Sequence, residues 1–196
     1  MKYIMIDTAG ASAYVLVRNG DMQASTQLPN EKRHSDVLLG ELDGLLRKVD
    51  MKVTDLDYMG VVTGPGSFTG IRIGIATIKG FAAMNNCNLI GLTVFDVLSE
   101  EVASGRALLK CTKTSCYYAD YKNYKIIGSG VIDNSELQDE NYFVVAGDGL
   151  EGAKRQEITD YEELLKKAME KAIKTKNFVQ NNKLEAVYMQ KPQAER

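Results

Sequence analysis

The chain has 196 residues, of which 44% are hydrophobic and 26% charged, a balance typical of one globular domain or two small ones. Its net charge of −2 argues against a protein that binds nucleic acid alone, since phosphate contacts require a basic face. No apolar run approaches the ~20 residues of a membrane helix and no cleavable leader precedes the first strand, so we expect a cytoplasmic protein.

The first half of the chain alternates apolar strands with amphipathic helices. Asn19-Gly20 lies between two apolar runs and predicts a tight hairpin. Apolar residues from Leu38 to Val49 recur at helical spacing, with Ser35 as a candidate cap. In chain order we expect strands over residues 3–8, 14–18, 22–28, 58–63 and 89–92, with helices over 36–49, after Gly70 and over 94–102.

The segment VVTGPGSFTGIRIGIA, residues 61–76, predicts a buried strand, a tight turn and the start of a helix. Gly64 and Gly66 allow backbone angles that other residues avoid, and Ser67 or Thr69 is expected to cap the helix. Such a turn either holds a phosphate or orients the helix that follows it.

Two nucleotide-binding motifs are excluded or weakened by the spacing in this turn. A P-loop requires Lys and then Ser or Thr directly after its last glycine, whereas Ile71 and Arg72 follow Gly70. A dinucleotide fingerprint has two residues between its second and third glycines, and here there are three. The turn is therefore not a P-loop and only weakly resembles a dinucleotide site.

The second half repeats the pattern with fewer helices. Strands are expected over residues 107–109, 117–121, 126–132 and 142–146, and an amphipathic helix over 161–173. We place a boundary near Ala103-Ser104-Gly105, which gives two lobes over residues 1–104 and 105–196. A meander that continues in alternation with helices predicts an α/β fold with a mixed sheet in each lobe.

The chain resembles the TsaB (YeaZ) family, closely over residues 1–104 and less closely afterwards. The Gly-Pro-Gly-Ser-Phe-Thr-Gly turn at residues 64–70 is the most specific element of the resemblance. The other matching segments are Ile4-Met5-Ile6-Asp7-Thr8-Ala9, His34-Ser35 ahead of Leu38-Leu39, Gly91-Leu92-Thr93, and the tail from Val187 to Arg196. The resemblance implies a duplicated ribonuclease-H-like fold of the actin, sugar-kinase and Hsp70 superfamily, with a reduced second lobe.

The resemblance also implies a function. TsaB is a non-catalytic subunit of the machinery that transfers a threonylcarbamoyl group to the adenosine beside the tRNA anticodon. It forms a heterodimer with TsaD, works alongside the ATPase TsaE, reaches tRNA only through the complex, and can form homodimers. The donor, a threonylcarbamoyl-adenylate, is made by another enzyme.

Asp7 and Thr8 are the weak candidates for cofactor binding, because active members of the superfamily hold magnesium and a nucleotide phosphate at this turn. Their pattern is Asp-x-Gly-Thr, whereas here Thr8-Ala9-Gly10 displaces the glycine by one residue. We expect Asp7 and Thr8 to bond instead to the backbone of their own turn. No cofactor is expected, except a nucleotide held at a subunit interface.

No catalytic residue and no metal site are predicted. TsaD binds its metal through paired histidines, but this chain has one histidine, His34. Cys87, Cys111 and Cys116 form no Cys-x-x-Cys pair, as expected for reduced thiols. We expect His34 to orient the start of a helix or to lie at a contact surface.

The helix after Gly70 is the candidate partner interface. Ile71, Ile75 and Ile78 follow one stripe, and Gly70, Gly74 and Thr77 follow a second stripe of small residues. In TsaB this helix and the one after His34 contact TsaD. The predicted interface comprises His34, Leu38, Gly70, Ile71, Gly74, Ile75, Thr77 and Ile78. The alternative is that the small stripe packs only within the chain.

Two enzymes of the same superfamily compete with this interpretation. One is an ATP-dependent phosphotransferase with Asp7 as a magnesium ligand. The other is a glycoprotease-like peptidase, against which the single histidine argues. The chain also departs from the family at Lys110, where family members carry an acid followed by Ala-Arg, so the role of that acid does not transfer.

Overall fold

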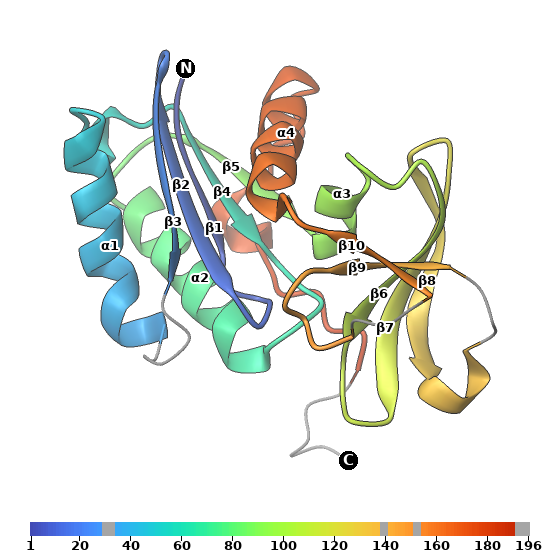
Figure 1. The fold of residues 1–196 in the computed structure, drawn as a ribbon. Helices are drawn as coiled ribbons and strands as arrows, with labels where there is room; N and C mark the ends of the chain where they lie inside the picture. The colour runs from blue at the N-terminus through green and yellow to red at the C-terminus, as the bar shows by residue number, and fades with distance from the viewer. Residues whose placement is uncertain (29–33, 138–140, 151–153, 191–196) are drawn as a thin grey trace.

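Two five-stranded sheets form the frame of the molecule, one in each lobe (Figure 1). The computed structural model describes residues 1–28, 34–137, 141–150 and 154–190. The predicted tail from Lys191 to Arg196 lies outside the described residues. Both sheets mix parallel and antiparallel strands, which confirms the α/β prediction.

The first sheet has the order β3-β2-β1-β4-β5. Its first three strands form an antiparallel meander, and β4 and β5 then add in parallel beside β1. The central strands are almost wholly buried because helices cover both faces of this sheet. The strands are β1 (Lys2–Asp7), β2 (Ala13–Asn19), β3 (Met22–Leu28), β4 (Tyr58–Val62) and β5 (Asn88–Leu92).

Helices α1 (His34–Lys48) and α2 (Phe68–Ala82) pack side by side on one face of the first sheet. Figure 1 shows α4 (Tyr161–Lys174) on the opposite face, next to α3 (Val94–Leu98). Because α3 ends at Leu98, it is shorter than the helix predicted over 94–102. A short 3-10 turn (Val53–Asp55) links α1 to β4.

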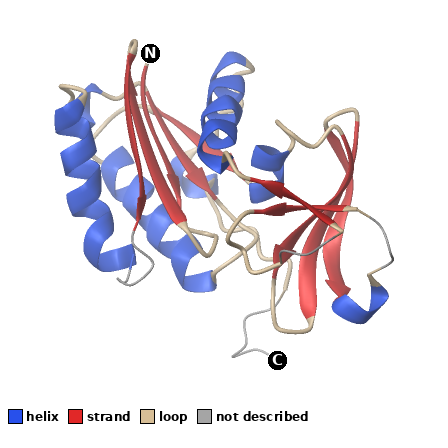
Figure 2. Ribbon diagram, viewed as in Figure 1, coloured by secondary structure: helices blue, strands red, loops and turns tan. Residues whose placement is uncertain are grey.

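The second sheet has the order β10-β9-β6-β7-β8. One face joins the main core through Ala107, Leu109 and Tyr121, and the Tyr121 hydroxyl donates to the Phe95 carbonyl at 2.7 Å. The described segments that connect the strands of this sheet are loops and one 3-10 turn (Asn134–Glu136), as Figure 2 shows. The strands are β6 (Ser104–Lys110), β7 (Ser115–Lys122), β8 (Lys125–Asp133), β9 (Tyr142–Val145) and β10 (Arg155–Ile158).

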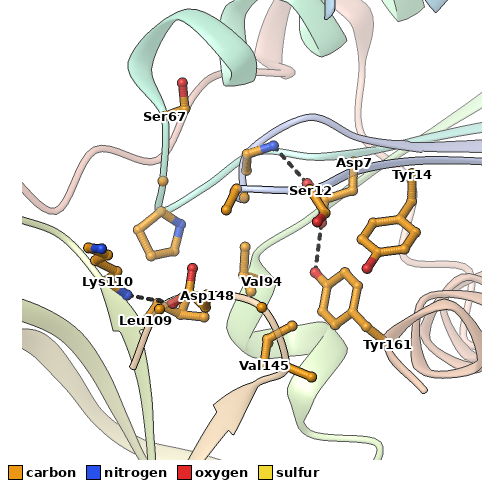
Figure 3. A pocket seen from close by; sticks show the side chains of 18 of the residues that line it. Asp7, Ser12, Tyr14, Ser67, Val94, Leu109, Lys110, Val145, Asp148 and Tyr161 are labelled. Carbon is orange, nitrogen blue, oxygen red and sulfur yellow. Dashed lines mark hydrogen bonds between the residues drawn. The ribbon is translucent and has the colours of Figure 1, made fainter. Parts of the chain in front are cut away.

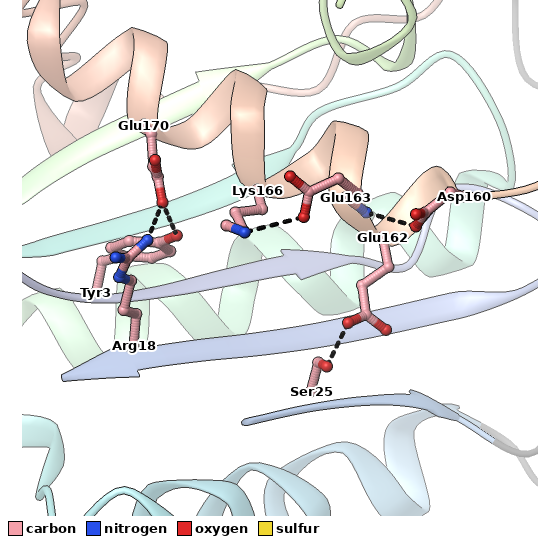
Figure 4. Close-up of polar contacts among 8 residues, drawn as sticks. All are labelled: Tyr3, Arg18, Ser25, Asp160, Glu162, Glu163, Lys166 and Glu170. Carbon is pink, nitrogen blue, oxygen red and sulfur yellow. Dashed lines mark hydrogen bonds and ion pairs between the residues drawn. The ribbon is translucent and has the colours of Figure 1, made fainter. Parts of the chain in front are cut away.

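After β10 the chain leaves the second lobe and returns to the first. Glu170 of α4 contacts both Tyr3 and Arg18, and Glu162 bonds to Ser25 (Figure 4). Beyond α4 and a 3-10 turn (Asn181–Lys183), the Val187 amide donates to the Thr63 carbonyl at 2.8 Å. The second sheet begins with β6 at Ser104, beside the predicted division, but α4 and the described residues that follow it pack on the first sheet.

Candidate functional site

A cavity of about 390 Å³ lies between the two lobes (Figure 3). The first lobe lines it with the turn between β1 and β2 and with the Pro65–Ser67 turn. The second lobe adds the end of β6 and the loop after β9, and Tyr161 closes one side. The candidate residue Asp7 therefore does lie in the interlobe cleft.

Both oxygens of the Asp7 carboxyl group accept hydrogen bonds from the chain itself. The Ala9 amide donates to Oδ1 at 2.8 Å, and the Tyr161 hydroxyl donates to Oδ2 at 2.7 Å. Burial raises the pKa of Asp7 from 3.8 to about 6, although these two hydrogen bonds act in the opposite direction. The bond to Ala9 is the predicted contact with the backbone of the turn.

Tyr161 reaches Asp7 because it is the first residue of α4, which Asp160 caps by accepting from the Glu163 amide. Its ring lies 5.4 Å from that of Tyr14, centroid to centroid. Burial and the nearby Asp7 carboxyl group raise the pKa of Tyr161 well above its ordinary value, so its hydroxyl remains a donor.

A magnesium-bound nucleotide at Asp7, considered above because of the resemblance, does not fit this arrangement. A divalent cation requires carboxylate oxygens that face open space. Asp7 is instead only 2% exposed, and its carboxyl group is turned toward Tyr161.

The turn after β4 has the backbone geometry that its glycines predict. Gly64 and Gly66 have φ angles of 120° and 154°, and the Gly64-Pro65 peptide bond is cis. Ser67 caps α2 by accepting from the Gly70 amide at 3.1 Å, which settles the choice between Ser67 and Thr69. The Ser67 amide donates in turn to the Ala9 carbonyl at 2.7 Å, so the two turns are joined directly.

The small stripe of α2 faces the inside of the first lobe. A Cβ atom at Gly70 would lie 1.9 Å from the Thr8 carbonyl oxygen, and one at Gly74 would lie 2.6 Å from the Thr8 Oγ1 atom. Thr8 also donates from Oγ1 to the Gly70 carbonyl at 2.6 Å. At Gly70 and Gly74 the stripe therefore packs within the chain, because these glycines let α2 lie on the Thr8 turn.

Most of the other predicted interface residues are also enclosed by the chain. Leu38, Ile71, Ile75 and Ile78 are buried, since they form the apolar sides of α1 and α2 against the sheet. Thr77 is half-buried and donates to the Ile73 carbonyl at 2.9 Å. His34 begins α1. A partner contact through these helices stays a prediction, but the buried Leu38, Ile71, Ile75 and Ile78 are not open to a partner.

The exposed sides of the same helices carry small residues instead. Gly40 and Gly44 of α1 and Gly80 of α2 have nothing within 4 Å of the place of a Cβ atom, and Ala76 is exposed. Sequence spacing alone did not separate these positions from Gly70 and Gly74. The periodicity shows which residues share a helix face, but only the packing shows which face is inside.

The loop Gly147–Gly149 is a lining segment that sequence reasoning missed. Gly147 and Gly149 have φ angles of 81° and 72°, and Asp148 accepts from the Lys110 amide at 2.7 Å. A Gly-Asp-Gly turn directly after an apolar strand was the signal that could have found it. Lys110, noted as a departure from the family, therefore lies at this cleft.

The described part of the matching tail, residues 187–190, packs beside the start of α2 through Tyr188. The rings of Phe68 and Tyr188 stack at 4.6 Å, and the Arg72 guanidinium lies 3.8 Å above Phe68. Arg72 Nε donates to the Tyr188 hydroxyl at 3.1 Å. The Gly-Pro-Gly turn, the first hairpin and the tail thus form one connected region.

Metal ligands are not clustered in the part of the chain that the structure describes. Cys87, Cys111 and Cys116 are free thiols, and burial raises the pKa of Cys87 and Cys116. None of the described helices is long and apolar enough to cross a membrane.

The fold and the cleft define the class of protein. Each lobe holds a mixed sheet that starts as a meander, and an acidic residue ends the first strand beside the cleft between them. This is the ribonuclease-H-like α/β fold of the actin-like superfamily, as predicted. A crystal structure described as YeaZ from Pseudomonas aeruginosa shares the fold with a TM-score of 0.76 at 16% identity, covering 95% of this chain and 99% of that one.

Sequence comparisons identify the family. Residues 28–191 match the family model described as TsaD, tRNA N6-adenosine threonylcarbamoyltransferase. The chain is 31% identical over 102 residues to TsaB, a tRNA threonylcarbamoyladenosine biosynthesis protein of Escherichia coli. This aligned segment covers 51% of this chain and 43% of the relative. It is 23% identical over 125 residues to TsaB of Buchnera aphidicola from Baizongia pistaciae, 60% of this chain and 57% of that relative. The chain belongs to the TsaB/YeaZ family, and it spans about half the length of these curated relatives.

Proposed function

We propose that this chain takes part in tRNA threonylcarbamoyladenosine biosynthesis as a non-catalytic subunit that binds TsaD and supports its activity. The family relationship supports the pathway. The observation that supports a non-catalytic role is the Asp7 carboxyl group, which is buried and bonded to Ala9 and Tyr161. In this proposal TsaE is a further partner, and tRNA is reached only through the complex.

The partner surface in this proposal is the exposed side of α1 and α2, here called the two-helix surface and defined by Gly40, Gly44, Ala76 and Gly80. A glycine inside a helix costs roughly 1 kcal/mol relative to alanine. Nothing in the described chain packs where a Cβ atom at Gly40, Gly44 or Gly80 would lie. Close approach by helices of TsaD, or of a second copy of this chain, would explain why glycine occupies these helix positions despite its cost.

The two-helix surface can be tested with Ala76→Arg. Because Ala76 is exposed, the variant should fold normally, while the long charged side chain should hold the partner helix away. We expect at least a tenfold loss of affinity for the cognate TsaD, about 1.4 kcal/mol, measured by calorimetry. Gln156→Arg adds the same charge to the exposed strand β10 and should bind like the parent. Equal affinity of the two variants would show that the contact lies elsewhere.

The absence of catalysis can be tested on the isolated chain. We expect no ATP hydrolysis and no digestion of casein above a buffer blank, because the carboxyl group of Asp7 is already bonded within the chain. Activity that disappears in Asp7→Ala would replace the scaffold proposal with one of the two enzymes considered above. Activity that survives Asp7→Ala would point to a contaminant.

A further inference from the structure

Strand β8 forms the outer edge of the second sheet. Figure 1 shows it at the margin of the molecule, beside β7 alone. None of its nine residues is buried. Ile127 is 66% exposed and Ile126 38% exposed, so the edge is apolar as well as open. Within the described residues, its backbone bonds only to β7. Such an edge is a template for another strand.

The sequence of β8, KIIGSGVID, is nearly symmetric about its central residue, Ser129. A basic residue begins the strand and an acidic one ends it, with two branched apolar residues next to each and small residues in the middle. The symmetric pairs are Lys125 with Asp133, Ile126 with Ile132, Ile127 with Val131, and Gly128 with Gly130. An antiparallel pair of identical strands places such positions opposite one another.

We propose that β8 pairs antiparallel with β8 of a second copy of this chain, around a two-fold axis near Ser129. The contact is isologous, so each residue pair occurs twice. Lys125 of each copy meets Asp133 of the other, and the exposed Ile126 and Ile127 are covered by the branched residues of the partner's strand. The two sheets then join into one continuous sheet across the dimer.

Charge fixes the register of this pairing. Sliding the strands by two residues separates Lys125 from Asp133 and moves glycine opposite isoleucine. Strand β8 has a β-bulge at Ile127, opposite Asp120 and Tyr121 of β7. The bulge displaces Lys125 by about one residue relative to Asp133 of the partner copy, and the long lysine side chain spans that displacement. Of the two edges of the first sheet, β3 has no charged residue and β5 is bridged by Val179, so neither has a comparable signal.

The test uses charge reversal at the two ends of β8. In Lys125→Asp, two acidic groups face each other at both ends of the dimer, and in Asp133→Lys two basic groups do. We expect each variant to dimerise roughly tenfold more weakly than the parent, measured by sedimentation over a concentration series. An equimolar mixture of the two variants restores opposite charges at both ends and should form a one-to-one heterodimer.

The mixture makes the test decisive, because loss of folding cannot create a heterodimer. This matters for Asp133, whose carboxyl group also caps a 3-10 turn by accepting from Ser135. Lys183→Asp makes the same charge change outside the second sheet and should dimerise like the parent. A parent that stays monomeric at all concentrations, or variants that do not associate when mixed, would overturn the proposal. So would a dimer that Ala76→Arg abolishes while the β8 variants leave it unchanged.

Discussion

Replacing Gly70 with alanine is expected to destabilise the folded chain by about 3 kcal/mol, the upper range for overpacking a rigid site. The new Cβ atom would lie 1.9 Å from the Thr8 carbonyl oxygen and 3.3 Å from Ser67 Cβ. A backbone carbonyl does not move aside as a flexible side chain does, so α2 must shift off the turn. Denaturant unfolding followed by circular dichroism measures the loss.

Gly80→Ala is the matched control in the same helix. Nothing lies within 4 Å of the position that its Cβ atom would take. The substitution should therefore show only the improved helix propensity, a gain of roughly 0.5–1 kcal/mol. Opposite signs at Gly70 and Gly80 would establish which side of α2 packs inside. Equal stability of Gly70→Ala and the parent would show that the Thr8 turn is not fixed.

Asp7→Asn is expected to remove a pH dependence from the stability of the protein. The pKa of Asp7 is raised from 3.8 to about 6 in the folded state, so the folded chain binds a proton more readily than the unfolded one. The resulting stabilisation is complete below pH 3.8 and is lost as the pH rises through about 6. A shift of this size corresponds to on the order of 3 kcal/mol.

The measurement is the difference between the unfolding free energies of the parent and of Asp7→Asn across this pH range. The asparagine amide keeps the size of the group and an oxygen that accepts from Ala9. Taking the difference removes the contribution of the other carboxyl groups, which titrate alike in both proteins. A difference that does not change with pH would mean that Asp7 titrates normally in the folded chain.

Local signals in the sequence predicted most of the first lobe. The hairpin at Asn19-Gly20, the cap at Ser67 and the apolar period of α1 each depend on residues a few positions apart. The inward side of α2 was not predictable in this way, because its glycines pack on Thr8, which lies 62 residues before Gly70. Two helix faces of similar composition differ only in what the rest of the chain places against them.

The second lobe was predicted less completely for a related reason. Strand β10 has the sequence RQEI, which lacks an apolar period, and it forms only because it pairs in parallel with β9. The amphipathic pattern of α4 predicted a helix, but nothing in it indicated the sheet on which it packs. The contact of Tyr161 with Asp7 joins residues 154 positions apart.

The return of α4 to the first sheet has a consequence for the order in which the protein matures on the ribosome. Met169 of α4 is fully buried, and its sulfur lies 2.6 Å from where a Cβ atom of Gly60 would be. That face of the first sheet therefore stays uncovered throughout the synthesis of the second sheet. The lobe that begins first is completed last, so a nascent chain exposes apolar β1 and β4 until residue 174 has emerged.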